Sequence, residues 1–241
     1  AGFIPFTPGA SPDEPVNTTL QQLDNQIEIN IESYGLVTET MDTPEGEFTL
    51  LSMKDAGRQG NVGAPGLPFK GIYVEVPPGV DVQVSTAGFA EELPGTYQIM
   101  PVQHPELDCG DRAPKPVFQF NTDAYVSSKS FPGVQARIAT DGFIRDKRVI
   151  FLEIFPVQYT PATGILTVTP DMTVTVSWTG TPDARIIADR ARLSSPVFDN
   201  FTSRIVVNDL KLHENKKIAQ GKAGQRDSRN GADYLIITAD Q

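Results

Sequence analysis

The sequence is poor in the residues that most often carry chemistry. Its 241 residues include one cysteine and two histidines. A single cysteine cannot form an internal disulfide, so cysteine content does not identify the compartment. There is no H-x-x-x-H motif, no EF-hand loop and no glycine-rich phosphate loop. We therefore expect no metal, no cofactor and no catalytic site, and hence no enzyme within this chain.

Charge and hydrophobicity argue against two classes of partner. The 20 basic and 30 acidic residues give a net charge of −10, whereas nucleic acid requires a basic footprint. No run of about 18 apolar residues occurs, so we expect no membrane-spanning helix. The chain starts at Ala1 without a basic and apolar leader, which is consistent with a processed, secreted protein.

Short runs of alternating apolar and polar residues make up much of the chain. A period of two places one side of a strand in a core and the other in water. Pro77-Pro78-Gly79 and similar turn sequences separate the runs, and this one is expected to close a hairpin. The pattern predicts a mainly β protein, an antiparallel β-sandwich or jelly roll. The clearest runs are 27–31, 72–76, 80–84, 149–155, 165–169 and 173–178.

One short helix is expected near residue 196. Ser195 can cap it and Pro196 suits its first position. Apolar residues follow at helical spacing, and we expect this stripe to dock on the edge of the sandwich. The stripe comprises Val197, Phe198, Phe201 and Ile205.

Composition divides the chain into four parts. Residues 1–22 are rich in proline and acid and are interpreted as a loosely held arm, and 23–210 form the sandwich. Residues 211–231 lack apolar periodicity and carry six bases and two acids up to position 229, typical of a linker open to proteases. The run ADYLIITADQ, 232–241, is typical of a buried parallel strand and predicts the start of a following α/β domain.

The stretch LDCGDRAPKP, 107–116, suggests a presenting loop. Prolines at 105, 114 and 116 restrict the backbone, and Gly110 permits a bend. A stiff loop with one long cation, Arg112, could enter a partner's pocket at low entropic cost. An ordinary surface loop is the plainer alternative.

Cys109 lies in the same loop, five residues after His104. A cysteine–histidine pair can form a nucleophile. No rigid element is expected to fix this pair, so we interpret the two as unrelated surface residues.

Three stretches carry a family resemblance. The first is GAPGLPFKGIYVEVPPGVDVQV at 63–84, with a Gly-x-Pro-x-Leu-Pro motif. The second, 130–177, contains Phe-Pro-Gly at 131–133, Arg145-Asp146 and the Pro-x-Gln-Tyr-x-Pro block at 156–161. The third is ADYLIIT at 232–238. Together they resemble the propeptide of gingipain-type cysteine peptidases, with the opening strand of the caspase-like catalytic domain at the end.

The resemblance implies a secreted zymogen. Its β-sandwich prodomain would keep its own downstream cysteine peptidase latent and assist its folding. In arginine-specific members the prodomain presents an arginine to the specificity pocket. The loop 104–116 falls where that inhibitory loop lies, and Arg112-Ala113 resembles its Arg-Ala step, between Asp111 and the second candidate anchor, Lys115.

The same resemblance gives the linker a role. A peptidase specific for basic residues could release its own prodomain at Lys222, Arg226 or Arg229. The family's catalytic cysteine would lie beyond residue 241, so Cys109 would not be that nucleophile.

Two alternatives stay open. Asp-Cys-Gly-Asp around Cys109 resembles the cysteine switch of metallopeptidase prodomains, so the thiol could maintain latency by binding zinc or by a mixed disulfide. Alternatively, the sandwich is a binding or adhesion module that precedes another domain. The basic linker discriminates between these functions, because an adhesion module needs no cleavable segment.

Overall fold

The computed structural model describes residues 1–105 and 117–210. Residues 1–210 form one compact unit, and 211–241 are assigned to a second. The strands of the first unit are β1 (Gly2–Pro5), β2 (Asn17–Gln22), β3 (Gln26–Glu32), β4 (Gly35–Thr43), β5 (Gly46–Ser52), β6 (Gly57–Gln59), β7 (Leu67–Glu75), β8 (Asp81–Gly88), β9 (Glu91–Glu92), β10 (Ala136–Ile144), β11 (Lys147–Ile154), β12 (Val157–Thr160), β13 (Ile165–Val168) and β14 (Asp171–Thr179). The helices are α1 (Thr122–Tyr125), α2 (Ala184–Ala191) and α3 (Pro196–Ile205).

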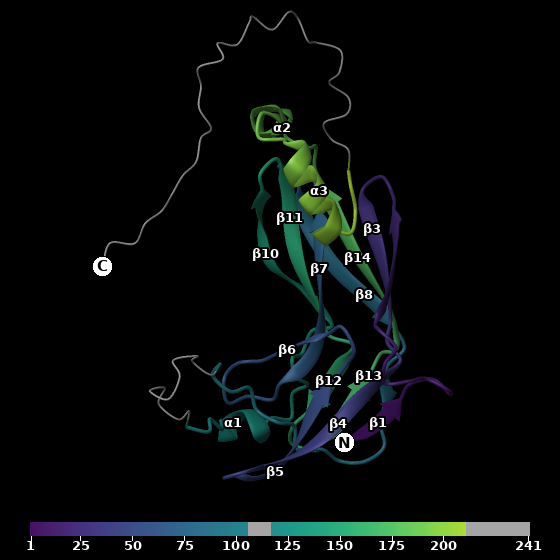
Figure 1. Ribbon diagram of the computed structural model, residues 1–241, viewed down its shortest axis with the longest axis vertical. Helices are drawn as coiled ribbons and strands as arrows, with labels where there is room; N and C mark the ends of the chain where they lie inside the picture. The colour runs from purple at the N-terminus through teal and green to yellow at the C-terminus, as the bar shows by residue number, and fades with distance from the viewer. Residues whose placement is uncertain (106–116, 211–241) are drawn as a thin grey trace, which may run out of the picture. The chain divides into compact units, whose positions relative to one another are not determined.

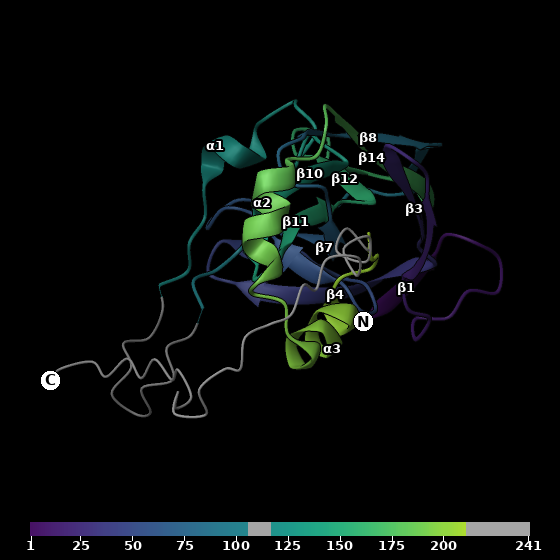
Figure 2. The ribbon, with the colours of Figure 1, turned by 90° about the horizontal axis from the view of Figure 1, so that it is seen from above.

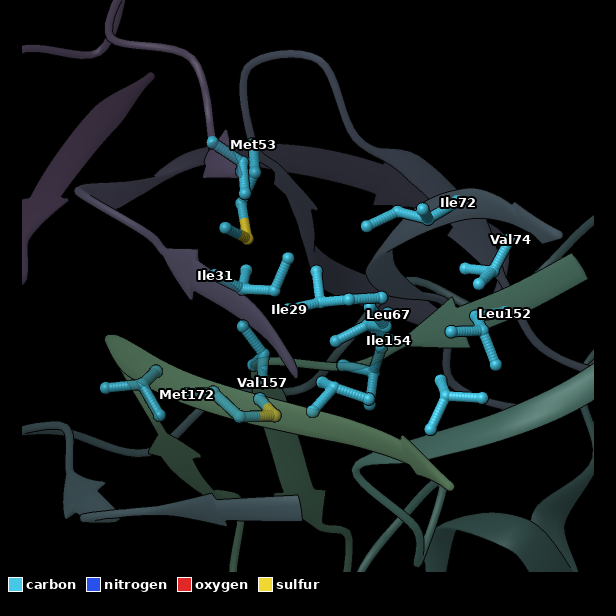
Figure 3. Packing of buried hydrophobic residues seen from close by; sticks show 14 of the residues in the cluster. Ile29, Ile31, Met53, Leu67, Ile72, Val74, Leu152, Ile154, Val157 and Met172 are labelled. Carbon is cyan, nitrogen blue, oxygen red and sulfur yellow. The ribbon is translucent and has the colours of Figure 1, made fainter. Parts of the chain in front are cut away.

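Two four-stranded antiparallel sheets enclose the larger part of the core. Their strand orders are β2-β3-β14-β8 and β10-β11-β7-β6. Every second residue of β3 and β14 is buried, as the alternation predicts. In Figure 3, Ile29 and Ile31 of β3 point toward side chains of the other sheet, among them Ile72 and Leu152. The expected mainly antiparallel β fold is confirmed.

Two three-stranded sheets extend the same core. Their orders are β1-β4-β5 and β12-β13-β9. Leu36 and Leu51 from the first and Leu166 and Val168 from the second belong to the same buried cluster as the four-stranded sheets. Figure 1 shows the three-stranded sheets at one end of this unit and most of the four-stranded sheets at the other.

The N-terminal residues are held more firmly than the expected loose arm. β1 pairs with β4, and β2 pairs with β3 from Asn17 opposite Glu32 to Gln22 opposite Ile27. Both are edge strands of their sheets. β2, with the sequence NTTLQQ, has no buried residue, so its polar composition resembles that of a free arm.

The turn at residues 77–79 does not close a hairpin, contrary to the expectation. β7 pairs with β11 and β6, whereas β8 pairs with β14 in the other four-stranded sheet. The turn therefore carries the chain from one sheet to the other. Gly79 has a φ of +83°, and a Cβ there would come within 2.6 Å of Cβ of Asp183. Both constraints favour glycine at this position.

The helices depart from the expectation in two ways. α3 lies where it was predicted, directly after Ser195, but its apolar stripe does not dock on the sandwich. Thr202 is its only buried residue, while Val197 is 77% exposed. α2 was not predicted, although Asp183 caps it by accepting hydrogen bonds from the N–H groups of Arg185 and Ile186. Its sequence, ARIIADRA, has only two large apolar residues, Ile186 and Ile187, too few to form a recognisable stripe.

The C-terminal residues of the unit pair with β7 on the same edge as β6, beyond the end of that short strand. Val207 N–H donates to Tyr73 O at 2.9 Å, and Val206 forms a parallel bridge with the same tyrosine. The Asn208 side chain accepts from Glu75 N–H at 2.7 Å and donates to Glu75 O at 3.0 Å. Residues 206–210, which we call the tail, thus act as an additional strand.

A buried carboxylate secures the end of the tail. Glu75 Oε2 accepts from Leu210 N–H at 3.2 Å and from Lys147 Nζ at 3.0 Å. Lys147 Nζ also lies 3.0 Å from Asp209 Oδ1. Burial raises the pKa of Glu75, and Lys147 and the Leu210 N–H offset only part of that rise.

Two kinds of feature are absent from the described part of the chain. Within 1–105 and 117–210 no helix has the length and apolar character needed to span a membrane. In the same residues no group of three or more histidine, cysteine, aspartate or glutamate side chains is arranged to hold a metal ion.

Candidate functional site at the base of the 106–116 loop

The predicted site residues all lie outside the described part of the chain. These residues are Cys109, Asp111, Arg112, Ala113 and Lys115 of the loop, and Lys222, Arg226 and Arg229 of the linker. The structure does describe the two flanks of the loop, up to Pro105 and from Val117. We call residues 99–103 and 118–121 the neck, because they flank the loop in the sequence.

The first flank is bound to a neighbour on each side. Met100 N–H donates to Thr49 O at 2.8 Å. Two residues further on, Val102 N–H donates to Ala64 O at 2.9 Å and Val102 O accepts from Gly63 N–H at 2.8 Å. This flank is therefore paired like a strand, although it belongs to none of the four sheets.

Gln103 joins the two flanks through its side-chain amide. Its Oε1 accepts from Gln119 N–H at 2.8 Å, and its Nε2 donates to Gln119 O at 2.9 Å. The amide thus satisfies both backbone groups of Gln119, as an antiparallel strand partner would. We call this pair of hydrogen bonds the Gln103 clamp.

An aromatic cluster holds the second flank. Phe118, Phe120 and Tyr125 surround the buried ring of Phe48, with centroid distances of 5.9, 5.7 and 6.0 Å. Aromatic pairs at these distances stabilise the fold by more than the burial of their surface alone would. The Tyr125 hydroxyl donates to Ile99 O in the first flank. Burial raises the pKa of Tyr125, so the hydroxyl keeps the proton that it donates.

The Gly-x-Pro-x-Leu-Pro motif borders both flanks. Gly63 O accepts from Asn121 N–H at 2.9 Å, in addition to the bond from Gly63 N–H to Val102 O. Gly63 has a φ of +82°, and a Cβ there would lie 3.2 Å from Asn121 N. The motif thus has a structural role in the neck that its sequence does not disclose.

Two motifs of the second stretch, Phe-Pro-Gly and Pro-x-Gln-Tyr-x-Pro, also meet in space. Phe131 and Tyr159 exchange backbone hydrogen bonds of 2.7 and 2.8 Å. The Gln158 side chain accepts from Gly133 N–H at 3.2 Å and donates to Val134 O at 3.1 Å. The Phe-Pro-Gly and Pro-x-Gln-Tyr-x-Pro sequences are therefore two halves of one contact.

The chemistry visible at the neck is structural. The described residues bring together hydrogen bonds and aromatic rings, without a nucleophile and base in contact. His104 is described and exposed, whereas its possible partner Cys109 is not described. The sequence predicts a loop at 104–116 but gives no sign of the role of Gln103 or of the residues that hold Gln119.

Comparison with known proteins assigns this arrangement to a family. The family model Propeptide_C25 matches residues 7–202. The chain belongs to the Propeptide_C25 family. Together with the fold, this membership confirms the resemblance to gingipain propeptides and identifies the chain as a propeptide of a cysteine peptidase, not a catalytic domain.

Among curated proteins, this Propeptide_C25 chain is similar to Lys-gingipains of Porphyromonas gingivalis. Lys-gingipain of strain ATCC 33277 is 27% identical over 176 residues, which are 70% of this chain and 10% of the relative. Lys-gingipain HG66 matches to the same extent. The chain therefore spans about a tenth of the length of these relatives.

Two solved structures share the fold. A structure of gingipain K from P. gingivalis, concerned with its zymogenic latency, has a TM-score of 0.62 at 24% identity and covers 75% of this chain and 99% of its own. The complex of P. gingivalis RgpB pro- and mature domains has a TM-score of 0.66 at 20% identity and covers 83% of this chain and 98% of its own.

Proposed function

We propose that this chain is the inhibitory prodomain of a secreted cysteine peptidase zymogen. It would block the active site of its own downstream peptidase with the 104–116 loop and assist the folding of that domain. The neck carries this proposal. The clamp, the aromatic cluster and the backbone pairs fix both ends of the loop, and a loop with fixed ends loses less entropy when it binds.

Arg112 is the proposed substrate-like anchor. Its guanidinium would pair with a carboxylate in the specificity pocket, flanked by Asp111 and Ala113. Buried charged pairs at interfaces couple by about 1.5–7 kcal/mol. Lys115 is the competing anchor, and the similarity to Lys-gingipains favours testing it with equal care.

The linker would be the site of release. Cleavage after Lys222, Arg226 or Arg229 would separate the prodomain from the peptidase. Each of these positions lies beyond Leu210, where the first unit ends. The folded part of the prodomain would therefore be left whole by any of the three cleavages.

Inhibition tests these roles directly. The chain is titrated against the mature peptidase encoded downstream, with Arg112→Ala, Lys115→Ala and Cys109→Ser in parallel. Loss of an anchor should weaken inhibition by about 2 kcal/mol or more, which is about 30-fold. We expect this loss in Arg112→Ala and none in Cys109→Ser.

The other outcomes reassign the roles. Loss only in Lys115→Ala would make that residue the anchor, and loss only in Cys109→Ser would assign latency to the thiol. If the unmodified chain does not inhibit, the proposal is wrong. A linker that then stays intact in the secreted product would favour the adhesion module.

A further inference from the structure

One side of α3 is apolar and largely exposed in the described part of the chain. Val197 is 77% exposed, Phe201 54% and Phe198 43%. The only buried residue of the helix is Thr202. Figures 1 and 2 show α3 directly after α2 in the chain, with α2 next to β10 and β11. Most of the side of the helix that was expected to dock on the sandwich is therefore exposed to solvent.

Two arginines extend this side into a continuous surface. The guanidinium of Arg145 lies 4.2 Å above the ring of Phe198, and that of Arg190 lies 3.5 Å above the ring of Phe143. Arg190 NH1 also donates to Arg145 O at 2.7 Å, and Arg145 Nε donates to Leu193 O at 2.7 Å. These contacts join β10, α2 and α3. We call Phe143, Arg145, Arg190, Val197, Phe198 and Phe201 the arginine–aromatic surface.

Its composition is that of a protein interface. Aromatic residues and arginine are enriched at the centres of interfaces and among their energetic hot spots. The rings already hold both guanidiniums in place, so little side-chain entropy remains to be lost on binding. Contiguous exposed apolar groups on a soluble domain mark interaction sites.

Charge restricts the choice of partner. A second copy bound about a two-fold axis would bring Arg145 and Arg190 toward their own counterparts, and like charges in contact cost binding energy. A partner with an apolar centre and carboxylates at its rim fits better. The peptidase follows α3 in the polypeptide, and such a tether raises the effective concentration of the two surfaces.

We propose that the arginine–aromatic surface is a second binding site for the mature peptidase, separate from the loop. This inference rests on the proposed function. Figure 1 shows α3 next to the four-stranded sheets and α1, which follows the neck, next to the three-stranded sheets. A peptidase bound at both places would be fixed in orientation, so that the loop meets the active site in one pose.

The test separates this surface from the loop. Val197→Gln and Phe201→Gln are combined in the full chain, and Phe89→Gln is the control because Phe89 is 91% exposed and lies between β8 and β9. Glutamine suits a helix and removes the apolar group. Binding is measured to mature peptidase whose catalytic cysteine is capped by a covalent inhibitor that also fills the specificity pocket, so that the loop cannot enter the active site.

We expect the double variant to bind the capped peptidase about tenfold or more weakly, since hot-spot losses are of this size. Phe89→Gln should bind like the unmodified chain, and the melting temperatures of all three should agree. Equal binding by the double variant overturns the proposal. So does a dimer of the unmodified chain, seen by sedimentation, that the double variant abolishes. A chain that binds the capped peptidase through this surface without inhibiting the free enzyme supports the second site and refutes the inhibitory loop.

Discussion

The Gln103 clamp can be removed without changing either backbone that it joins. Gln103→Ala deletes the two hydrogen bonds to Gln119, of 2.8 and 2.9 Å. Each such bond contributes about 1 kcal/mol net, so the free energy of opening the neck should fall by about 2 kcal/mol. That is about a 30-fold larger open population. The Gln119 amide hydrogen should exchange with solvent faster by the same factor.

Two variants isolate the cause. Gln119→Ala keeps the backbone N–H and C=O that the clamp uses and loses only the side-chain bond to Val117 O at 3.0 Å. It should exchange like the unmodified chain at position 119. Gln103→Glu keeps an acceptor for the Gln119 N–H but turns a carboxylate oxygen toward Gln119 O, so it should resemble Gln103→Ala.

Amide exchange followed by NMR at neutral pH is the assay, with melting temperature as the measure of global stability. The exchange of the core amides in β3 should change little in Gln103→Ala, because the neck opens locally. If the Gln119 amide exchanges at the same rate in Gln103→Ala and the unmodified chain, the clamp does not close the neck. Inhibition of the peptidase should weaken in the same order as exchange accelerates.

Three further predictions concern the stability of the folded unit. Gly63→Ala should lower the free energy of unfolding by about 1–3 kcal/mol, and by more than Gly46→Ala. Both glycines have positive φ, but only a Cβ at Gly63 would have a close neighbour. Urea denaturation measures both changes. Lys147→Met should cost about 3 kcal/mol in the same assay, since it leaves Glu75 buried without its cation. The raised pKa of Glu75 means that the native state holds that proton more tightly than the unfolded chain. Stability should therefore fall as pH rises from 4.5 through the raised pKa, and the fall should be absent in Glu75→Gln; equal slopes in the two proteins would contradict the burial argument.

The sandwich was predictable because its signal is local. β3 and β14 alternate strictly, and each bears one buried side, so a period of two was sufficient. The partners of a strand are set by distant residues instead. The residues of the Pro77-Pro78-Gly79 turn are typical of a hairpin, but β8 pairs with β14, which lies far along the chain.

The construction of the neck was not predictable from the sequence. Proline and glycine content marked the loop, and a family resemblance suggested its use. Gln103 and Gln119 are polar, irregularly spaced residues, and nothing periodic indicates that one would bond to the other. The apolar stripe of α3 is the opposite case, because its pattern is recognisable in the sequence but its partner is not. Its spacing predicted the helix correctly, but an apolar stripe does not say whether its partner lies in the same chain.

The tail has a consequence for the fate of the prodomain once the two proteins separate. Its hydrogen bonds to Tyr73 and Glu75 end at Leu210, before every basic residue of the linker. A cut anywhere in that linker leaves β7 with all of these bonds. The liberated fragment would remain a folded competitor for the enzyme, so full activity would require its dilution or destruction as well as its cleavage. Activation would then have two stages, cleavage of the linker and loss of the fragment, and the length of the second depends on how long the fragment survives.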